Sequence, residues 1–356
     1  MIIGIIGAGL SGLVAGKKLA EAGHEVVMVE KSQQLGGRLA TVTGGESRIK
    51  IDTGISHFAA HEPDFKDFVG ELQEIDMVRE WTHYFGLYDG INLYRENPNK
   101  EFESYYIAPD GINEIPRHLS RWVDVRSDTK AGGITHIGSF RTKKHAWMIN
   151  LTNIDVIEVD AVILASPAPE AYAVLQTAQN ETAARRIIRH IDEINYKQTL
   201  TVMAGYGEQE QPKWQGIEFM DDRLWWAYNE TSKRNNPSET ALVLHSQSDF
   251  AKKYKREDEE TFTGLMLDRL GEIMGDWAAQ PDWIQTTHWR YMLAENPMED
   301  PFIELEMEEA PLALVGDYLG GNTVEAAYLS GLKLANHWIE KYKDEITDAD
   351  HAKPLL

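Results

Sequence analysis

The sequence contains no cysteine among its 356 residues. Disulfides, thiolate metal sites, cysteine nucleophiles and cofactors attached through sulfur are therefore excluded for this chain. The absence of cysteine is consistent with a reducing compartment, and we predict a cytoplasmic location.

Basic residues are scarce, with 35 Lys and Arg against 57 Asp and Glu, and the formal net charge is −22. This charge repels nucleic acids and anionic lipid surfaces, so neither is an expected partner. An uninterrupted apolar run of the roughly 20 residues that a membrane span requires is also lacking. The apolar N-terminal stretch precedes Lys17 and Lys18 rather than following a basic segment, which argues against a signal peptide. We therefore expect a soluble, enzyme-sized globular protein.

The first twenty residues, MIIGIIGAGLSGLVAGKKLA, predict a strand, a glycine-rich turn and a helix. Gly7 permits a tight turn, Gly9 lets the backbone approach a pyrophosphate, and Gly12 allows close packing of helix and strand. This pattern predicts a dinucleotide site. Its predicted cofactor-binding residues are Gly7, Ala8, Gly9, Leu10, Ser11 and Gly12.

A second apolar strand in HEVVMVEK ends at Glu30, where a carboxylate can accept hydrogen bonds from ribose hydroxyls. We add Glu30 and Lys31 to the predicted site. NAD and FAD proteins share this pattern, so the following LGGR segment has to discriminate between them. Gly36 and Gly37 offer bare backbone beside the phosphates, and Arg38 can pair with them, a combination that resembles flavoprotein amine oxidases.

The segment VGDYLGGNTVEAAYLSGLKLA at 315–335 carries a second cofactor signal. A strand end places Gly316 for close approach and Asp317 as an acceptor for a hydroxyl group. The helix that follows directs its N-terminus toward an anionic ligand. Further predicted contacts come from the first turn of this helix, at Val324, Glu325 and Ala327.

The order of these elements predicts an α/β fold with interleaved domains. A Rossmann-type FAD-binding domain, three-layered around a parallel sheet, is expected from residues 1–75, 120–170 and 300–341. An α+β substrate domain with a mixed or antiparallel sheet is expected from 76–119 and 171–299. Helices are predicted at about 63–75, 171–192 and 257–276. The apolar strand ending at Ala165 and Pro167 suits a central strand close to the ligand.

Nearly the whole chain resembles the renalase family of FAD-dependent, amine-oxidase-like flavoproteins. Beyond the cofactor motifs, the resemblance is carried by DTGISHF at 52–58, YIAPDGINEIPRHL at 106–119, YNETSKRN at 228–235 and THWRYM at 287–292. It implies noncovalent FAD, with Asp52 and the backbone of Val125 among the cofactor contacts.

The same resemblance implies an oxidase that accepts a hydride from a small donor, is reoxidised by O2 and releases hydrogen peroxide. The implied donors are misreduced isomers of dihydronicotinamide dinucleotides. The chain departs from this family at Ser56-His57, where relatives usually carry Gln-Tyr, and at Ile55, where they carry a small residue. Cofactor identity is therefore better supported than substrate identity.

Hydride transfer to a flavin requires little acid–base chemistry from the protein. The candidate catalytic residues are His57, His245, Trp226, Trp289 and Tyr291. Because alternate side chains of a strand face opposite ways, Trp225 and Trp226 are expected on opposite faces. Arg290 and Lys233 could meet substrate phosphates, with exposed salt bridges as the default interpretation.

Several alternatives remain at this point. A flavin amine oxidase or a desaturase-like enzyme would share the cofactor domain, a non-catalytic flavin-binding protein would retain FAD without turnover, and a plain NAD-binding protein is disfavoured by LGGR. The spacing of His57 and His61 could suit a metal, but we predict no metal site. The oligomeric state is not predicted.

Overall fold

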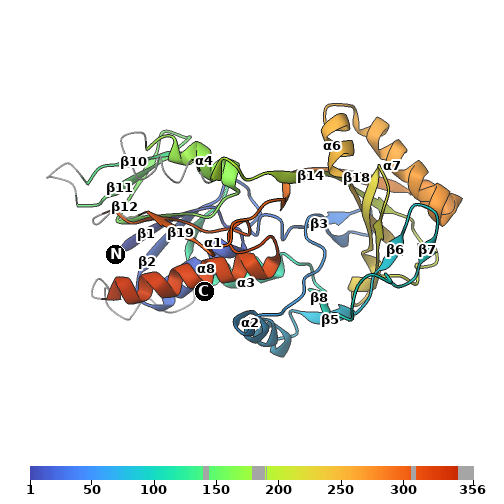
Figure 1. The fold of residues 1–356 in the computed structure, drawn as a ribbon, viewed down its shortest axis with the longest axis horizontal. Helices are drawn as coiled ribbons and strands as arrows, with labels where there is room; N and C mark the ends of the chain where they lie inside the picture. Colours follow the sequence, from blue (N-terminus) through green and yellow to red (C-terminus); the bar gives the residue numbers. More distant parts are fainter. Residues whose placement is uncertain (139–143, 179–188, 190, 306–309, 344–356) are drawn as a thin grey trace. The chain divides into compact units, whose positions relative to one another are not determined.

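The computed structural model describes residues 1–138, 144–178, 189, 191–305 and 310–343. The chain forms two compact units with interleaved segments (Figure 1). Unit 1 comprises Met1–Gly37, Ile115–Asn195 and Ala294–Leu356, and unit 2 comprises Arg38–Glu114 and Tyr196–Leu293. These limits differ from the domain boundaries proposed above mainly because residues 38–75 belong to unit 2. The functional assignment of the two domains stays a prediction.

The core of unit 1 is a six-stranded sheet in the order β19-β20-β13-β1-β2-β9. Its central strands are apolar and buried, as a parallel sheet covered on both faces requires. All neighbours pair in parallel except β19, which is antiparallel to β20. The strands are β1 (Ile2–Ile6), β2 (Glu25–Val29), β9 (Asp124–Arg126), β13 (Ala161–Leu164), β19 (Ile303–Leu305) and β20 (Leu312–Leu314).

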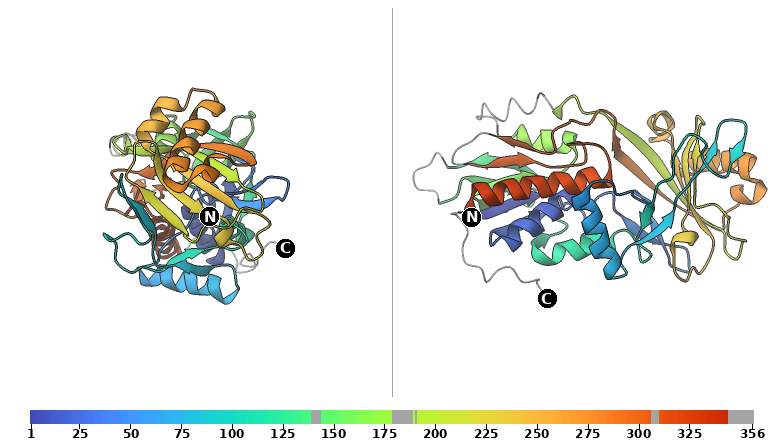
Figure 2. Two further views of the ribbon diagram at one scale, coloured as in Figure 1. Left: turned by 90° about the vertical axis from the view of Figure 1, so that its right-hand side faces the viewer. Right: turned by 60° about the horizontal axis from the view of Figure 1, so that its bottom comes forward.

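Two helices, α1 (Leu10–Glu21) and α8 (Val324–Lys341), lie side by side against this sheet (Figures 1 and 2). Their backbones come close at Gly331, where an added Cβ would lie 2.1 Å from the Ser11 carbonyl oxygen. A second sheet of β10 (Ala131–His136), β11 (Trp147–Leu151) and β12 (Val156–Val159) covers the other face. The predicted three-layer arrangement around a parallel sheet is therefore confirmed.

Shorter elements connect these layers. They are α3 (Glu114–Leu119), which begins at the boundary between the units, the 3-10 turn η1 (Ser120–Trp122) and α4 (Ala168–Leu175). The helix predicted at 171–192 matches only α4 in part, and residues 179–188 and 190 lie outside the described residues.

Unit 2 is built on a seven-stranded mixed sheet in the order β18-β14-β17-β16-β15-β6-β7, where β6 and β15 pair in parallel. One face packs against α6 (Ser248–Tyr254), α7 (Glu259–Met274) and the 3-10 turn η3 (Asp276–Ala279). The mixed sheet predicted for the substrate domain is confirmed. Its strands are β6 (Gly86–Tyr88), β7 (Leu93–Tyr94), β14 (Tyr196–Gly205), β15 (Gly216–Phe219), β16 (Leu224–Asn229), β17 (Ala241–Ser246) and β18 (Trp283–Ala294).

The remaining elements of unit 2 are two two-stranded sheets, a helix and a short turn. The predicted helix at 63–75 is observed, with Pro63 in its first turn, as is the one at 257–276, which Asp258 caps by accepting from the Thr261 N–H at 2.7 Å. The remaining elements of unit 2 are β3 (Thr41–Gly44), β4 (Ile49–Asp52), α2 (Pro63–Glu74), β5 (Arg79–Thr82), β8 (Tyr105–Ile107) and η2 (Thr231–Lys233).

Among the described residues, no helix is long and apolar enough to cross a membrane.

Candidate functional site

The turn between β1 and α1 has the backbone geometry that its glycines predict. Gly7 has a φ of +107°, and a Cβ added there would lie 2.6 Å from the Ala165 carbonyl oxygen. At Gly12 an added Cβ would lie 2.4 Å from the Gly7 oxygen. Gly9 differs, because the nearest atom to a Cβ there, the Ala165 oxygen, is 3.9 Å away. Bare backbone therefore faces open space at Gly9, where a cofactor phosphate can approach.

Helix α1 begins directly after Gly9, which has no side chain with which to cap the helix. The N–H groups of the first helical turn are thus available to an anion, and the helix dipole favours negative charge there. The residues present fit a dinucleotide diphosphate at this position.

Glu30 lies at the end of β2 beside the same turn, with its side chain buried. Its carboxylate accepts hydrogen bonds from the Ala8 N–H and the Ser32 N–H, both at 2.9 Å. Lys31 is directed elsewhere, since its ammonium group pairs with Glu170. Proximity to the glycine turn therefore favours Glu30 over Lys31 as a cofactor contact.

The LGGR segment returns to the glycine turn. The Gly36 N–H donates to the Ala8 carbonyl at 2.8 Å, and a Cβ on Gly37 would lie 3.8 Å from the Gly9 Cα. Both residues have positive φ, at +105° and +57°, a conformation that favours glycine. Two glycine segments separated in sequence thus lie against each other in unit 1.

The other predicted cofactor residues of unit 1 sit at strand ends and helix starts. Val125 is the parallel partner of Met28 in the sheet. The Gly316 N–H donates to the Ser330 hydroxyl at 3.0 Å, which ties the end of β20 to α8. Those at the ends of β13 and β20 or the starts of α4 and α8 are Ala165, Pro167, Gly316, Asp317, Val324, Glu325 and Ala327. Their contact with FAD stays a prediction.

Arg38 and Asp52 are the predicted cofactor residues that fall in unit 2. A guanidinium N–H of Arg38 donates to the Met292 carbonyl at 3.1 Å. Asp52 is fully buried, and its carboxylate accepts from the Thr41 hydroxyl at 2.8 Å and the Ile112 N–H at 3.0 Å. Within unit 2, Asp52 is thus held in place by hydrogen bonds from other protein residues.

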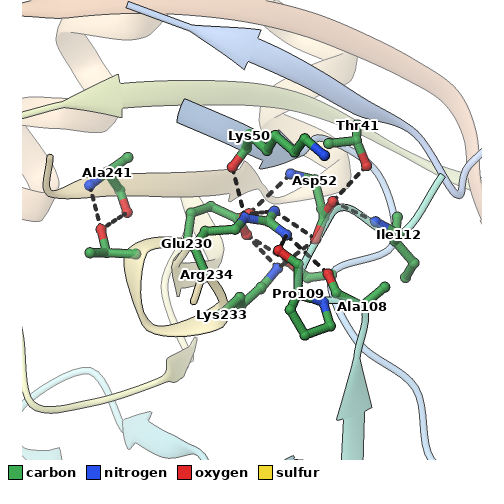
Figure 3. Close-up of polar contacts among 12 residues, drawn as sticks. Thr41, Lys50, Asp52, Ala108, Pro109, Ile112, Glu230, Lys233, Arg234 and Ala241 are labelled. Atoms are coloured by element: carbon green, nitrogen blue, oxygen red, sulfur yellow. Dashed lines mark hydrogen bonds and ion pairs between the residues drawn. The ribbon is translucent and has the colours of Figure 1, made fainter. Parts of the chain in front are cut away.

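Asp52 belongs to a buried ion cluster with Glu230, Lys233 and Arg234 (Figure 3). The Arg234 guanidinium lies 3.0 Å from Asp52 and 2.8 Å from Glu230. The Lys233 ammonium pairs with Glu230, lies 3.5 Å from Asp52 and donates to the Ser56 hydroxyl at 2.6 Å. Lys233 is 0% exposed, so the expectation of an exposed salt bridge at this residue is wrong.

The charges of the ion cluster compensate one another. Burial raises the pKa of Asp52, but the neighbouring cations and the two hydrogen bonds lower it by more than burial raises it. The pKa of Asp52 therefore lies below its usual value. Burial lowers the pKa of Arg234, whereas the two carboxylates raise it, and the net result is a raised pKa. Both groups therefore remain charged at neutral pH.

His57 and His245 flank an aromatic face of the unit 2 sheet, opposite α6 and α7. The largely buried rings of this face are those of Phe85, Tyr105, Trp226 and Tyr228. His57 packs against these rings at centroid distances of 4.6–6.2 Å. Although the His57 side chain is partly exposed, its Nδ1 is covered and has no hydrogen-bond partner among the described residues.

Both imidazoles are held in their neutral form. Burial lowers the pKa of His57 to about 3, and the positive charges of Lys233 and Lys100 act in the same direction. Burial also lowers the pKa of His245 to about 3, with a further contribution from Lys233 that outweighs the opposing effect of the Gly54 backbone. His245 Nδ1 is 2.8 Å from the Thr201 hydroxyl. The aromatic face thus contains no cationic histidine near neutral pH.

The structure corrects the expectation for the tryptophan pair of β16. A register shift between Leu224 and Trp226 marks a β-bulge, so the simple alternation of side chains fails there. Trp226 is buried in the aromatic face, and Trp225 packs against the same cluster, partly exposed. The bulge therefore directs both indoles toward one face.

The remaining candidates lie on β18. Trp289 donates its indole N–H to the Thr53 carbonyl at 2.8 Å, and Tyr291 packs edge-on against Tyr196. Arg290 is exposed, and His61 pairs with Glu103. The structure therefore brings His57, His245 and Trp226 together in unit 2, while Trp289 and Tyr291 have separate partners.

Three residues of this region escaped the sequence-based prediction: Ser56, Glu230 and Arg234. The charged residues of YNETSKRN resemble a solvated turn in sequence, and the only hint of burial was the apolar strand before them. Asp52 and Glu230 are separated by 178 positions, so no local pattern could pair them.

Residues 5–72 match the NAD(P)-binding Rossmann-like domain, and residues 87–338 match the model of flavin containing amine oxidoreductases. The chain belongs to the flavin-containing amine oxidoreductase family. The prediction of an FAD-dependent oxidoreductase is thereby confirmed at the level of the family.

Curated relatives of this amine oxidoreductase include oxidases and desaturases. The flavin-dependent L-tryptophan oxidase RebO of Lentzea aerocolonigenes is 35% identical over 85 residues, which are 23% of this chain and 18% of that protein. The 15-cis-phytoene desaturase of Narcissus pseudonarcissus is 30% identical over 115 residues, 32% of this chain and 20% of the relative. The matches thus span about a fifth of the length of these relatives.

Solved structures show the same fold at low sequence identity. Cyclohexylamine oxidase from Brevibacterium oxydans has a TM-score of 0.73 at 12% identity, covering 96% of this chain and 99% of that one. A putative protoporphyrinogen oxidase from Exiguobacterium has a TM-score of 0.72 at 11% identity, with the same coverage. These similarities confirm the predicted fold class. They do not extend to the renalase subfamily, which stays a prediction.

Proposed function

We propose that this amine oxidoreductase is an FAD-dependent oxidase of a small amine. The reaction removes a hydride from a carbon bonded to nitrogen and a proton from the nitrogen, leaving an imine. O2 takes up the two electrons and two protons and becomes hydrogen peroxide. The family match over 87–338, together with the glycine turn of unit 1, carries this proposal.

Unit 1 supplies the residues that would hold FAD noncovalently. The open helix N-terminus at Gly9 suits the diphosphate, and the carboxylates of Glu30 and Asp317 suit hydroxyl groups of the ribose and ribityl chain. When bound, FAD supplies the hydride acceptor and returns the electrons to oxygen. The protein itself then has to bind and orient the donor and exclude water.

The aromatic face of unit 2 is the candidate for donor binding. Its rings offer apolar, planar contacts, and His57 and His245 add neutral hydrogen-bonding groups because their pKa values are about 3. The nearby positive charge of Lys233 disfavours a second cation. We therefore expect the reacting nitrogen to be uncharged when the hydride leaves.

Dihydronicotinamide isomers are a second candidate donor. The renalase-like motifs of residues 106–119 and 287–292 favour them, as does the planar surface that Trp225 and Trp226 share. The two donor classes are chemically alike, because in each the nitrogen lone pair assists loss of a hydride from a carbon that is bonded to the nitrogen or conjugated with it. A desaturase-like reaction on a polyene lacks this nitrogen.

The test is anaerobic reduction of the purified flavoprotein by a panel of primary amines, amino acids and dihydronicotinamide isomers. Bleaching of the flavin by an amine, followed by stoichiometric peroxide on admitting oxygen, is the expected result. Bleaching by dihydronicotinamides alone would move the assignment to the second candidate. Bound flavin that no donor reduces would refute the oxidase and indicate a non-catalytic flavin-binding protein.

A matched pair of variants tests the donor site. His57→Asn removes the imidazole from the aromatic face, and His61→Asn removes an exposed histidine that pairs with Glu103. We expect slower flavin reduction only for the first. Equal rates of flavin reduction in both variants would show that the aromatic face does not bind the donor.

A further inference from the structure

A cavity of about 570 Å³ opens beside the aromatic face of unit 2. Its volume lies in the range of small-molecule sites, about 300–1,000 Å³. Residues from the strands β6, β14, β15 and β16 and from loops of unit 2 line it, among them Lys100, Lys197, Glu218, Asp221 and Trp225. We call it the Trp225 cavity.

The Trp225 indole is at this cavity because of the β-bulge in β16. Without the register shift between Leu224 and Trp226, side-chain alternation would direct adjacent tryptophans to opposite faces. Bulges recur beside functional sites, where they redirect a side chain. The bulge therefore places the partly exposed Trp225 ring at the cavity, whereas a regular strand would direct it to the opposite face.

The charged residues of the cavity differ in how far they are neutralised. Glu218 pairs with Lys100 at 3.0 Å. Asp221 pairs with Arg269 at 2.7 Å and accepts hydrogen bonds from two backbone N–H groups. Burial raises the pKa of Asp221, but these contacts outweigh it, and the pKa lies below its usual value. Each carboxylate thus has a cation as its partner.

Lys197 has no carboxylate partner among the described residues. Its ammonium lies 5.4 Å from the centre of the Trp225 ring, and the side chain is half-buried. Lys100 is placed similarly, 5.3 Å from the Trp226 ring, but it shares its charge with Glu218. In a chain of net charge −22, the cavity thus presents an uncompensated cation next to a planar ring.

We propose that the Trp225 cavity binds a planar aromatic molecule that carries an anionic group, with the ring on Trp225 and the anion on Lys197. Carboxylates complement an ammonium by a charge-assisted hydrogen bond, and aromatic rings stack on indole. If this ligand is the donor, which rests on the proposed function, the donor carries an acidic group away from the reacting nitrogen.

Binding of two probes that contain no nitrogen tests the site apart from turnover. Phenylacetate and 2-phenylethanol have nearly the same shape and differ in charge, and their affinities for the holoprotein are measured by calorimetry. We expect phenylacetate to bind about tenfold more tightly, a difference that high salt reduces. Equal affinities, or no binding of phenylacetate, would overturn the proposal.

Lys197→Gln should abolish the preference for the carboxylate, and Trp225→Leu should weaken both probes. The matched control is Lys253→Gln, because Lys253 also lies over an aromatic ring of unit 2, 4.8 Å from the centre of Tyr254, but outside the cavity. Phenylacetate affinity that survives Lys197→Gln, or that falls equally in the control, would refute the assignment. Absence of amine oxidation would refute only the proposed function, since neither probe depends on turnover.

Discussion

Replacement of Lys233 by methionine tests whether the buried ion cluster stabilises unit 2. Methionine retains most of the apolar stem and removes the charge. Lys233 is 0% exposed, and its ammonium contacts Glu230, Asp52 and Ser56. The variant leaves two buried carboxylates with Arg234 as their remaining cation in the cluster.

The expected loss in the free energy of unfolding is large. Removing one partner of a buried ion pair costs about 3–5 kcal/mol, because the remaining charge stays buried without compensation. The matched control is Lys100→Met, which breaks a pair with Glu218 in which the lysine side chain is 44% exposed. An exposed pair contributes about 0.2–1 kcal/mol, so the two variants should differ severalfold.

The loss should also depend on pH. In the wild type, the lowered pKa of Asp52 contributes stability that is present above the unfolded pKa, near 4, and lost as the pH falls through the folded value. Removing the Lys233 cation raises the folded pKa of Asp52. The destabilisation should therefore be full at pH 7 and shrink toward pH 3.

Urea unfolding of the holoprotein, followed by tryptophan fluorescence at pH 7 and pH 4, measures both effects. A double variant, Lys233→Met with Glu230→Gln, should recover part of the loss because it removes one uncompensated carboxylate. A Lys233→Met variant no less stable than Lys100→Met, or equally destabilised at both pH values, would refute the argument.

Three further predictions address the cofactor and the titrating groups. Gly12→Val should abolish flavin retention, because even a Cβ at this position would lie 2.4 Å from the Gly7 oxygen. The control Gly70→Ala should retain the flavin, because a Cβ there has no atom within 4 Å. The ratio of flavin to protein absorbance measures retention in both variants. Asp52→Asn should flatten the loss of stability below about pH 5, measured by urea titration, and an unchanged acid profile would contradict the lowered pKa. Because the pKa values of His57 and His245 are about 3, their imidazole NMR signals should not titrate between pH 5 and 8, and a midpoint in that range would contradict these lowered pKa values.

The cofactor half of the protein could be predicted from sequence because its signals are local. Gly7, Gly9 and Gly12 act within one strand, one turn and one helix, where covalent geometry alone restricts the backbone. The approach of Gly36 to Ala8 also follows from a short connection after β2. Family membership depends on these motifs and on the similarity along residues 87–338.

Tertiary structure alone decided the character of unit 2. The charges around Lys233 resemble a solvated turn in sequence, and only the folding of β4 against that turn buries them with Asp52. The shared face of Trp225 and Trp226 likewise depends on the register of β16 against β17, which a single strand does not specify. Local sequence sets backbone conformation, whereas burial and register arise from contacts between distant segments, and these contacts determine which charges and rings are available for binding.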